Sequence, residues 1–409
     1  MRTVGGSLFR RLWVAAAISY LGDGLGLTAF PLLVASLTRD PMLVAGATIA
    51  LEAPWLLFAL PGGALVDRVD RRLAMVSADS VRAVVVAVLA VLALGGNAPI
   101  WAIYAVALAL SSAGTIFDPA SEAIVPLVVD HEAIPEANSR LEATSWTCNF
   151  LLGPPLGASL FALVAAVPFL LDAGSFIASA LIVFTLPGAY RSLRPTTSSI
   201  ASDVGEGLHW LVVHPVLRYT SALAGITNLA STAIVAVFVL FAQDVVQVSD
   251  VGYGLLLSCI GVGGIVGAIL AGKVVAGIGS AGALRLSTCL GAPAAGIMAA
   301  IPHPAIVALA VFAFGFSISL WNVTHISLRQ LLVPDQLRGR VAASNRLIAW
   351  GSQPIGAALG GLVAMLFGLR APMLLAAILL AFATLVVFTK VTPLAIAAAQ
   401  QRAEAQDPA

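Results

Sequence analysis

The stretch GGALVDRVDRR, residues 62–72, ends one long apolar run and begins a charged turn. The apolar run before it, residues 43–66, is long enough to cross a bilayer, because a spanning helix needs about 20 apolar residues. The glycines allow close approach to a neighbouring helix, since they have no side chain to hold the backbones apart. The three arginines that follow indicate a cytoplasmic loop, because Lys and Arg gather on that side of a membrane. This stretch therefore predicts the cytoplasmic end of a transmembrane helix.

The rest of the chain has the composition of a multi-pass membrane protein. Hydrophobic residues make up 60% of the 409 residues and charged residues only 10%, whereas soluble domains have about 45–50% and about 25%. So few charges cannot cover the surface of a water-soluble fold, which excludes a disordered chain, a secreted disulfide scaffold and a nucleic-acid-binding protein. Cys148, Cys259 and Cys289 lie in apolar stretches at unrelated spacings, so they predict small buried side chains and no metal site.

Apolar stretches of spanning length recur along the whole chain, and we expect an all-α membrane protein with twelve transmembrane helices. The expected spans are residues 12–37, 43–66, 76–95, 99–117, 141–165, 168–187, 217–243, 252–275, 284–301, 304–325, 341–366 and 370–389. The first stretch is too long for a signal peptide and lacks a small-residue cleavage site, so we expect it to stay in the protein.

The distribution of positive charge predicts the orientation in the membrane. With the N-terminus inside, only Arg39 and Arg370 of the 21 lysines and arginines fall on the outer side. Both termini are therefore expected in the cytoplasm, in a protein of the cell membrane. The expected division is an N-terminal six-helix half at 1–190, a cytoplasmic linker at 191–215, a C-terminal six-helix half at 216–390 and a cytoplasmic tail at 391–409.

Two pairs of segments indicate an internal repeat. PLGA at residues 155–158 aligns with PIGA at 354–357, and GGALVDR at 62–68 aligns more weakly with GAILAGK at 267–273. Two parallel halves related by a pseudo-two-fold axis along the membrane normal are typical of major facilitator transporters. The repeat therefore predicts two pseudo-symmetric halves.

Residues 62–72 resemble the G-x-x-x-D-R-x-G-R-R loop of the major facilitator superfamily. Asp70 stands where the family usually has Gly, a departure common in the branch of siderophore and macrolide exporters. The resemblance extends over residues 8–390 and implies the major facilitator fold. It also implies a gating network at the cytoplasmic side, in which Arg71 or Arg72 meets Asp118; without such a role, the arginines only anchor the topology. The implied gating residues are Gly63, Asp67, Arg68, Arg71, Arg72 and Asp118.

Residues 149–158, NFLLGPPLGA, resemble the G-x-x-x-G-P-x-x-G-G stretch associated with antiporters. Asn149 replaces the first glycine of that pattern and Ala158 replaces the last. A Gly-Pro pair removes a helix hydrogen bond and allows a kink. The resemblance implies export and implicates Gly153, Pro154 and Gly157, while ordinary close packing is the alternative.

Two carboxylates in the apolar spans are candidates for proton coupling, because a charge at the bilayer centre is costly. Asp23 is flanked by glycines that are expected to leave space around it, and Glu52 precedes Pro54 in the next span. No Lys or Arg is expected at the depth of Asp23, so burial favours the protonated form of both acids. The alternatives are a polar hinge at Asp23 and a hydrated position for Glu52.

Three other ionisable groups receive structural interpretations. Asp79 and Arg82 are three residues apart and predict an intrahelical ion pair. Asp172 is expected at the membrane interface, near the outer end of its helix. His325 is expected near the cytoplasmic end of its span, with a pH-sensing role as a minor alternative.

Aromatic and uncharged polar residues of the spans predict a cavity for a bulky amphipathic substrate, because no fixed cation is expected at depth to hold an anion. The expected lining residues are Tyr20, Phe30, Trp55, Trp146, Asn149, Asn228, Trp321, Asn322 and Gln353.

These features predict a proton-coupled secondary transporter that exports bulky amphipathic molecules (drugs, macrolides or siderophore-like metabolites) by alternating access. The expected partners are the small-molecule substrate and the lipid bilayer, the expected state is a monomer, and the energy source is a proton gradient without a cofactor. The chain has no Walker A or H-E-x-x-H pattern, so no enzymatic activity is expected. The alternatives are an uptake permease or facilitator for a small neutral solute, and a non-transporting membrane sensor or assembly factor.

Overall fold

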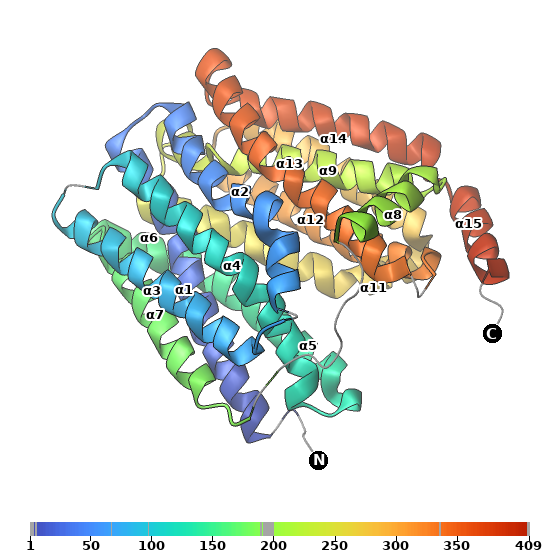
Figure 1. Cartoon of the computed structure of the whole chain (residues 1–409). Coiled ribbons are helices and arrows are strands. Elements are labelled where there is room, and N and C mark those ends of the chain that lie inside the picture. The colour runs from blue at the N-terminus through green and yellow to red at the C-terminus, as the bar shows by residue number, and fades with distance from the viewer. Residues whose placement is uncertain are drawn as a thin grey trace. The chain divides into compact units, whose positions relative to one another are not determined.

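The computed structural model describes residues 4, 6–66, 68–96, 98–188, 190, 200–334 and 337–406. Nearly all of them lie in helices (Figure 1). This follows from the apolar composition, because a backbone in a bilayer must satisfy its hydrogen bonds within the helix. The chain forms two compact units: Met1–Arg39, Gly46–Thr197 and Val248–Ser258 make up unit 1, and Asp40–Ala45, Ser198–Gln247 and Cys259–Ala409 make up unit 2.

Unit 1 is built around α1, which packs against α6 and α7, while α3 packs against α4 and α7 (Figure 1). Its elements are α1 (Ser7–Leu37), most of α2 (Pro41–Val66, of which residues 41–45 belong to unit 2), α3 (Arg71–Leu94), α4 (Ile100–Val128), the short 3-10 turn η1 (His131–Ala133), α5 (Ile134–Ser145), the π-helix η2 (Trp146–Leu152), α6 (Gly153–Leu163) and α7 (Val167–Phe184).

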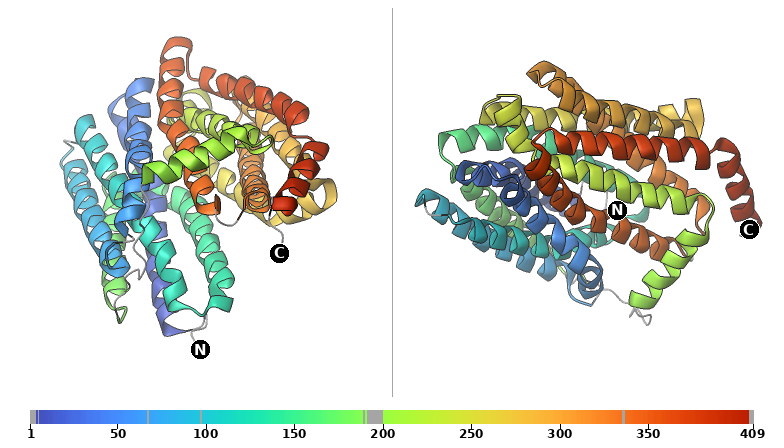
Figure 2. Two further views of the ribbon diagram at one scale, coloured as in Figure 1. Left: turned by 45° about the vertical axis from the view of Figure 1, so that its right-hand side comes forward. Right: turned by 90° about the horizontal axis from the view of Figure 1, so that it is seen from above.

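In unit 2, α9 lies beside α13 and α14, and α8 packs against α13 (Figure 2). The elements are α8 (Ile200–Val213), α9 (Leu217–Val235), α10 (Phe238–Leu240), the π-helix η3 (Phe241–Val245), α12 (Pro304–Leu332), α13 (Arg338–Phe367), α14 (Ala371–Lys390) and α15 (Pro393–Gln406). The long helix α11 (Asp250–Ala300) begins in unit 1 and continues in unit 2.

The number of separate helices differs from the twelve predicted spans. Among the described residues, nine helices are long and apolar enough to cross a membrane, or ten if α9 and the bent segment Phe238–Val245 form one span. The segment α11 has 51 residues and covers two predicted spans. It consists of two helices that meet at a kink, where the backbone leaves the helical region at Gly279, with φ 72°. The fifth predicted span corresponds to α5, η2 and α6, which follow one another without a break, with η2 as a π-helical stretch between two α-helices.

Some helices extend beyond the predicted spans at their polar ends. The span predicted at 99–117 corresponds to α4, which ends at Val128, and the span predicted at 304–325 corresponds to α12, which ends at Leu332. Hydropathy falls where polar side chains begin, but the helix continues because its backbone hydrogen bonds do not depend on them. Asp118 and His325 therefore lie inside helices and not at their ends.

The glycines of the internal repeat make equivalent contacts in the two units. A Cβ atom at Gly157 would lie 2.6 Å from the carbonyl oxygen of Leu25 in α1. A Cβ atom at Gly356 would meet the carbonyl oxygen of Leu229 in α9 even more closely. Only glycine permits this backbone-to-backbone approach. Through these repeated segments, α6 packs on α1 in unit 1 and α13 packs on α9 in unit 2.

Candidate functional site

A polar cavity of about 410 Å³ lies in unit 1, among residues of α1, α2, α3, α4, α5, η2 and α7. Five carboxylates and one guanidinium line it: Asp23, Glu52, Asp118, Glu122, Asp172 and Arg82. Four residues of the predicted substrate cavity line it as well: Tyr20, Phe30, Trp55 and Asn149. The structure thus brings both predicted proton-coupling acids together with aromatic and amide side chains.

The glycines around Asp23 serve close packing, which differs from the predicted open space. A Cβ atom at Gly24 would lie 2.5 Å from the carbonyl oxygen of Cys148. A Cβ atom at Gly22 would lie 2.5 Å from Oδ1 of Asp172. The space that these glycines leave is therefore filled by a neighbouring backbone and by a second carboxylate.

Arg82 lies in the same cavity as Asp23, so the prediction that no cation reaches this depth is wrong. Arg82 is 6% exposed, and its Nη1 lies 3.7 Å from Oδ1 of Asp79, as the intrahelical pairing predicted. The guanidinium also lies 4.8 Å from the ring centroid of Phe117 and 5.4 Å from that of Phe176. Cation–π contacts of this kind hold a buried guanidinium in place. The sequence pattern placed Arg82 near a helix end, whereas helix packing buries it.

Asp172, which is predicted at the membrane interface, is buried within unit 1. The residue is 1% exposed, and α7 holds it against the glycine face of α1. Arg82 interacts electrostatically with this carboxylate. A buried carboxylate is costly unless it is paired or protonated. This side chain is the functional candidate that the sequence interpretation missed, because distance from a helix end does not reveal which face is covered.

Arg82 is shared among several acids. Besides Asp79, it interacts electrostatically with Asp23, Asp118 and Asp172. One guanidinium balances one carboxylate charge, so the cluster has an excess of acids over cations in the described part of the chain. In a membrane such an excess requires protons or a bound cation. The cluster is therefore suited to binding positive charge.

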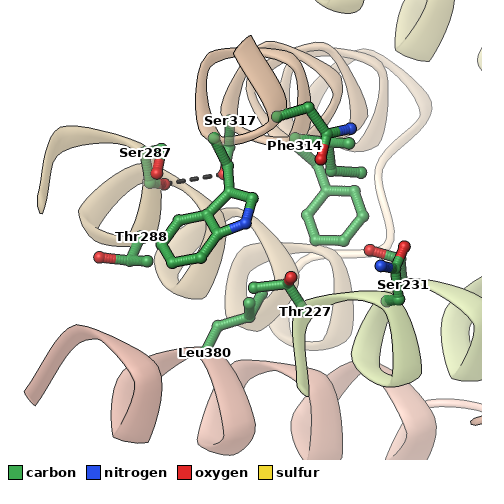
Figure 3. Close-up of a pocket in the computed structure, with 11 residues that line it drawn as sticks. Thr227, Ser231, Ser287, Thr288, Phe314, Ser317 and Leu380 are labelled. Atoms are coloured by element: carbon green, nitrogen blue, oxygen red, sulfur yellow. Dashed lines mark hydrogen bonds between the residues drawn. The ribbon is translucent and has the colours of Figure 1, made fainter. Parts of the chain in front are cut away.

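A second, small cavity of about 20 Å³ lies in unit 2 (Figure 3). Three predicted residues, Asn228, Trp321 and Asn322, line it, and none of its described lining residues is charged. Hydroxyl groups that the sequence interpretation did not single out complete it: Thr227, Ser231, Ser287, Thr288 and Ser317. A cavity of this volume holds about one water molecule.

Two predicted cavity residues line neither of these cavities. The indole Nε1 of Trp146 donates to Oε1 of Glu142 at 3.0 Å, within the same helical segment. Gln353 is half-buried in α13. His325, predicted near a cytoplasmic helix end, is buried in α12, with its ring 6.1 Å from that of Trp321. Helix rotation, which hydropathy does not determine, separates these residues from the cavity linings.

The side chain of Asp70, which stands where the family loop usually has glycine, makes hydrogen bonds that a glycine could not make. Its Oδ1 accepts hydrogen bonds from the backbone N–H groups of Arg72 and Leu73, at 3.0 and 3.3 Å, and so caps the N-terminus of α3. Its Oδ2 accepts from the N–H of Tyr190 at 3.0 Å. A carboxylate here therefore ties the start of α3 to the segment after α7.

The predicted gating residues occupy different surroundings. Arg71 donates to the carbonyl oxygen of Ala123 at 2.9 Å, and Arg72 donates to that of Leu186 at 2.6 Å. Among the described residues neither forms an ion pair with Asp118, which lines the cavity near Arg82 instead. In place of the predicted pair with Asp118, both guanidinium groups donate hydrogen bonds to backbone carbonyl oxygens.

The charged loop contains three more predicted gating residues: Gly63, Asp67 and Arg68. Arg68 is exposed, and Asp67 lies outside the described residues. A Cβ atom at Gly63 would meet nothing within 4 Å, whereas one at Gly62 would lie 2.5 Å from the carbonyl oxygen of Thr115. The close helix contact predicted for this loop therefore depends on Gly62.

The antiporter-like stretch packs tightly on α1. A Cβ atom at Gly153 would lie 2.5 Å from the Cα atom of Gly24. The π-helix η2 ends directly before Gly153, and single π-turns inside α-helices are frequent at functional sites. Pro154 is the second residue of α6, and its carbonyl oxygen accepts a hydrogen bond from Oγ1 of Thr28 at 3.3 Å. This stretch therefore fixes η2, and with it Asn149, against α1.

We expect Ser258→Ala to lower stability by about 1 kcal/mol, the net value of one buried hydrogen bond. Pro155 has no N–H, so the carbonyl of Leu151 loses its helix partner, and Ser258 Oγ donates to that carbonyl at 3.0 Å. Thermal unfolding of the purified protein in detergent measures the effect. Ser80→Ala is the control, because Ser80 Oγ bonds only the carbonyl of Val76 in its own helix. Equal melting of both variants would contradict the assignment.

Comparisons with known proteins identify the family of the chain. The transmembrane secretion effector family matches residues 4–409. The chain is 29% identical over 379 residues to the multidrug efflux pump Tap of Mycolicibacterium fortuitum, covering 88% of this chain and 90% of that protein. It is 28% identical over 370 residues to the enterobactin exporter EntS of Shigella boydii serotype 4 (strain Sb227), covering 88% of this chain and 86% of that protein.

The fold is also similar to solved transporter structures. A mutant of the nucleoside transporter NupG superposes with a TM-score of 0.80 at 12% sequence identity, covering 94% of this chain and 100% of that chain. At this identity the likeness shows the fold alone. The predicted all-α membrane fold of the major facilitator type is thereby confirmed.

Proposed function

The chain belongs to the transmembrane secretion effector family of major facilitator transporters, and we propose that it is a proton-coupled exporter of bulky amphipathic small molecules. It is a multi-span membrane transporter and not an enzyme. In the proposed cycle, alternating access exposes a central site first to one side of the membrane and then to the other. Protons entering from outside drive the substrate out.

The observation that carries this proposal is the acid-rich cavity of unit 1. Asp23 and Glu52 line it together with Tyr20, Phe30 and Trp55. A carboxylate that exchanges a proton for a substrate must contact the same space as the substrate. A cavity with acids, rings and amides meets this requirement and accommodates an amphipathic compound.

The direction of transport rests on the relatives. The curated relatives described above are named as an efflux pump and an exporter, and the segment at residues 149–158 resembles the antiporter pattern. These two features favour export over uptake. The transporter family itself favours transport over a sensor or assembly factor.

The proposal includes an arrangement of the chain in the membrane. Residues 1–190 and 216–390 form two six-helix halves, joined by a cytoplasmic linker at 191–215 and followed by a cytoplasmic tail at 391–409. Both termini lie in the cytoplasm, and the protein works as a monomer in the cell membrane. The distribution of Lys and Arg supports this orientation.

Transport into proteoliposomes tests the proposal. With an acidic lumen, antiport accumulates substrate inside, whereas proton symport requires an acidic exterior. For exchange of one proton, accumulation rises about tenfold per pH unit, because one unit is worth about 1.4 kcal/mol. Accumulation that follows the opposite gradient, or no gradient, would refute proton-coupled export.

We expect Asp67→Asn to reduce transport several-fold while the protein still inserts. The resemblance of residues 62–72 to the family loop implies that this carboxylate takes part in a gate at the cytoplasmic side, and the amide removes its charge. Proteoliposome uptake measures the loss. Asp130→Asn, which makes the same chemical change at an exposed residue of unit 1, is the control. If Asp67→Asn transports as well as the unaltered protein, the charged loop has no gating role and serves only to orient the protein in the membrane.

A further inference from the structure

We propose that a groove between α3 and α7 holds an anionic phospholipid, with an acyl chain along the groove and the phosphate group at Arg72 and Arg11. The two helices pack side by side within unit 1 (Figure 1). The groove shares no described lining residue with the acid-rich cavity. The inference therefore goes beyond the proposed transport function and does not depend on it.

The first observation is the shape of the groove, whose volume is about 410 Å³. Its lining residues from α3 recur at helical spacing and so share one face, and α7 supplies the other side: Val76, Ser80, Ala83, Val84, Ala87, Ile177, Ala180, Leu181 and Phe184. Ala83 and Ala180 are buried, whereas Val84 is 64% exposed and the side chain of Leu181 is 63% exposed. Small side chains thus form the base and large apolar side chains form the rims, which suits a long, thin apolar chain.

The length of the groove matches one leaflet of a bilayer. From Val76 to Ala87 the helix α3 rises by about 16 Å, at 1.5 Å per residue. One leaflet contributes about 15 Å to the hydrocarbon core. Arg72 precedes Val76 by about one helical turn. When an acyl chain fills the groove, the guanidinium group of Arg72 therefore lies at the level of the lipid headgroup.

The second observation is a pair of arginines at that end of the groove. The guanidinium carbon of Arg72 lies 5.8 Å from the ring centroid of Phe184, which lines the groove. Arg72 Nη1 donates to the carbonyl oxygen of Leu186 at 2.6 Å. Arg11 Nη1, from α1, donates to the carbonyl oxygen of Thr185 at 3.1 Å. Both guanidinium groups therefore meet at the C-terminal end of α7.

The positive charge of this pair is not balanced by the described part of the chain. None of the ion pairs found there includes Arg11 or Arg72, and Nε of Arg72 is buried without a hydrogen-bond partner. The carboxylate of Asp70 accepts backbone N–H groups with both of its oxygens. The carbonyl groups at the end of α7 supply only a partial negative charge. An anion is therefore required beside the two guanidinium groups.

The groove and the arginines together select the occupant. The groove accepts an apolar chain, and guanidinium groups bind phosphate oxygens in a matching planar geometry. Basic pockets between transmembrane helices recognise anionic lipid headgroups in this way. A zwitterionic lipid would bring a further positive group beside two arginines, so the site favours a phospholipid with net negative charge.

Competition between two lipids tests the proposal. The purified full chain is stripped of lipid in detergent and mixed with equal amounts of dioleoyl phosphatidylglycerol and dioleoyl phosphatidylcholine, which differ only in their headgroups. Native mass spectrometry measures the retained lipid. We expect at least about fivefold more phosphatidylglycerol, the contribution of one basic residue near an anionic headgroup. Equal retention would overturn the proposal, and so would a dimer that retains neither lipid, because a second copy would then cover the groove.

Soluble glycerol 3-phosphate distinguishes a lipid site from a phosphate site. It carries the phosphate group but no acyl chain, so at the same concentration it should leave bound phosphatidylglycerol in place. Displacement by glycerol 3-phosphate would show that the arginines bind phosphate without the groove, and it would refute the lipid assignment.

One variant tests the headgroup end of the site. Arg72→Gln should lower retention of phosphatidylglycerol about fivefold, towards that of phosphatidylcholine. Arg140→Gln makes the same change at an exposed position of α5, where Arg140 pairs with Glu136, and should retain lipid like the unaltered protein. Unchanged retention in Arg72→Gln would refute the role of this arginine.

A second variant tests the groove while both arginines stay in place. Ser80→Phe puts a large side chain among the lining residues and should lower retention of phosphatidylglycerol several-fold. Val88→Phe is the control, because Val88 is an exposed residue of α3 outside the lining. Equal retention by the two phenylalanine variants would refute the position of the acyl chain. If a variant fails to fold, the competition between the two lipids on the unaltered protein still decides on the proposal.

Discussion

Asp23→Asn is expected to abolish accumulation of substrate driven by a pH gradient, so that proteoliposomes with an acidic lumen reach no more than the external concentration. The asparagine has the same shape but neither binds nor releases a proton near neutral pH. The exchange of substrate for protons then stops. Substrate binding and downhill exchange between labelled and unlabelled substrate should persist, because the cavity keeps its other carboxylates.

The structure changes the physical basis of this prediction. Asp23 does not act in isolation, since Arg82 lines the same cavity and interacts electrostatically with it. We infer that the proton is shared within a cluster in which several aspartates compete for one guanidinium. Neutralising Asp23 removes one competitor and leaves Arg82 to the others. The coupled cycle is lost, whereas the ion pair of Arg82 with Asp79 is retained.

Two variants make this experiment decisive. Asp130→Asn makes the same chemical change at an exposed position outside the cavity, and it should accumulate substrate like the unaltered protein. Glu52→Gln removes the other predicted proton-coupling acid and shows whether the two acids are redundant. Full gradient-driven accumulation by the double variant Asp23→Asn/Glu52→Gln would refute coupling through these acids and favour facilitated diffusion.

Much of the fold follows from patterns that are local in the sequence. Hydropathy finds the apolar stretches, because each spanning helix must satisfy its own backbone hydrogen bonds. The repeat of PLGA and PIGA predicts equivalent contacts, and Gly157 and Gly356 make them. Helix ends are less predictable. Hydropathy ends the fourth span at residue 117, although α4 continues to Val128.

The cavity was predictable only in part, because its composition depends on how helices rotate and pack. Asp23 and Glu52 stand out as carboxylates inside apolar spans, and both line the cavity. Arg82 and Asp172 do not stand out, since each lies close enough to a predicted helix end for hydration to be the simpler interpretation. Packing of α7 against α1 and α3 buries both side chains. No pattern along one helix contains that information.

Asp70 shows a different limit to what can be predicted from the sequence. The sequence identifies it as a departure from the glycine of the family loop, but not its function. The structure shows a side chain that caps α3 and also accepts a hydrogen bond from Tyr190, far along the chain. The cap itself was open to prediction, since Asp is favoured before the first helical residue. The contact with Tyr190 depends on tertiary structure.

Gly157→Leu is expected to leave little folded protein, and Gly157→Ala should lower stability by about 1–3 kcal/mol, the usual cost of overpacking. Even one methyl group at this position would lie 2.6 Å from the carbonyl oxygen of Leu25, so α6 and α1 would have to separate. The higher helix propensity of alanine, about 1 kcal/mol over glycine, offsets only part of this cost. Thermal unfolding in detergent and the yield of monodisperse protein measure both variants.

The internal repeat provides a second copy of the same experiment. Gly356→Ala should destabilise the protein about as much as Gly157→Ala, because Gly356 makes the equivalent contact with Leu229 in unit 2. Gly174→Ala is the control: a Cβ atom there meets nothing within 4 Å, so the higher helix propensity of alanine should leave stability unchanged or slightly higher. If Gly157→Ala and Gly356→Ala melt like Gly174→Ala, the close helix contacts do not hold these pairs together. If only one of them is destabilised, the two copies of the repeat carry different structural roles despite their common sequence.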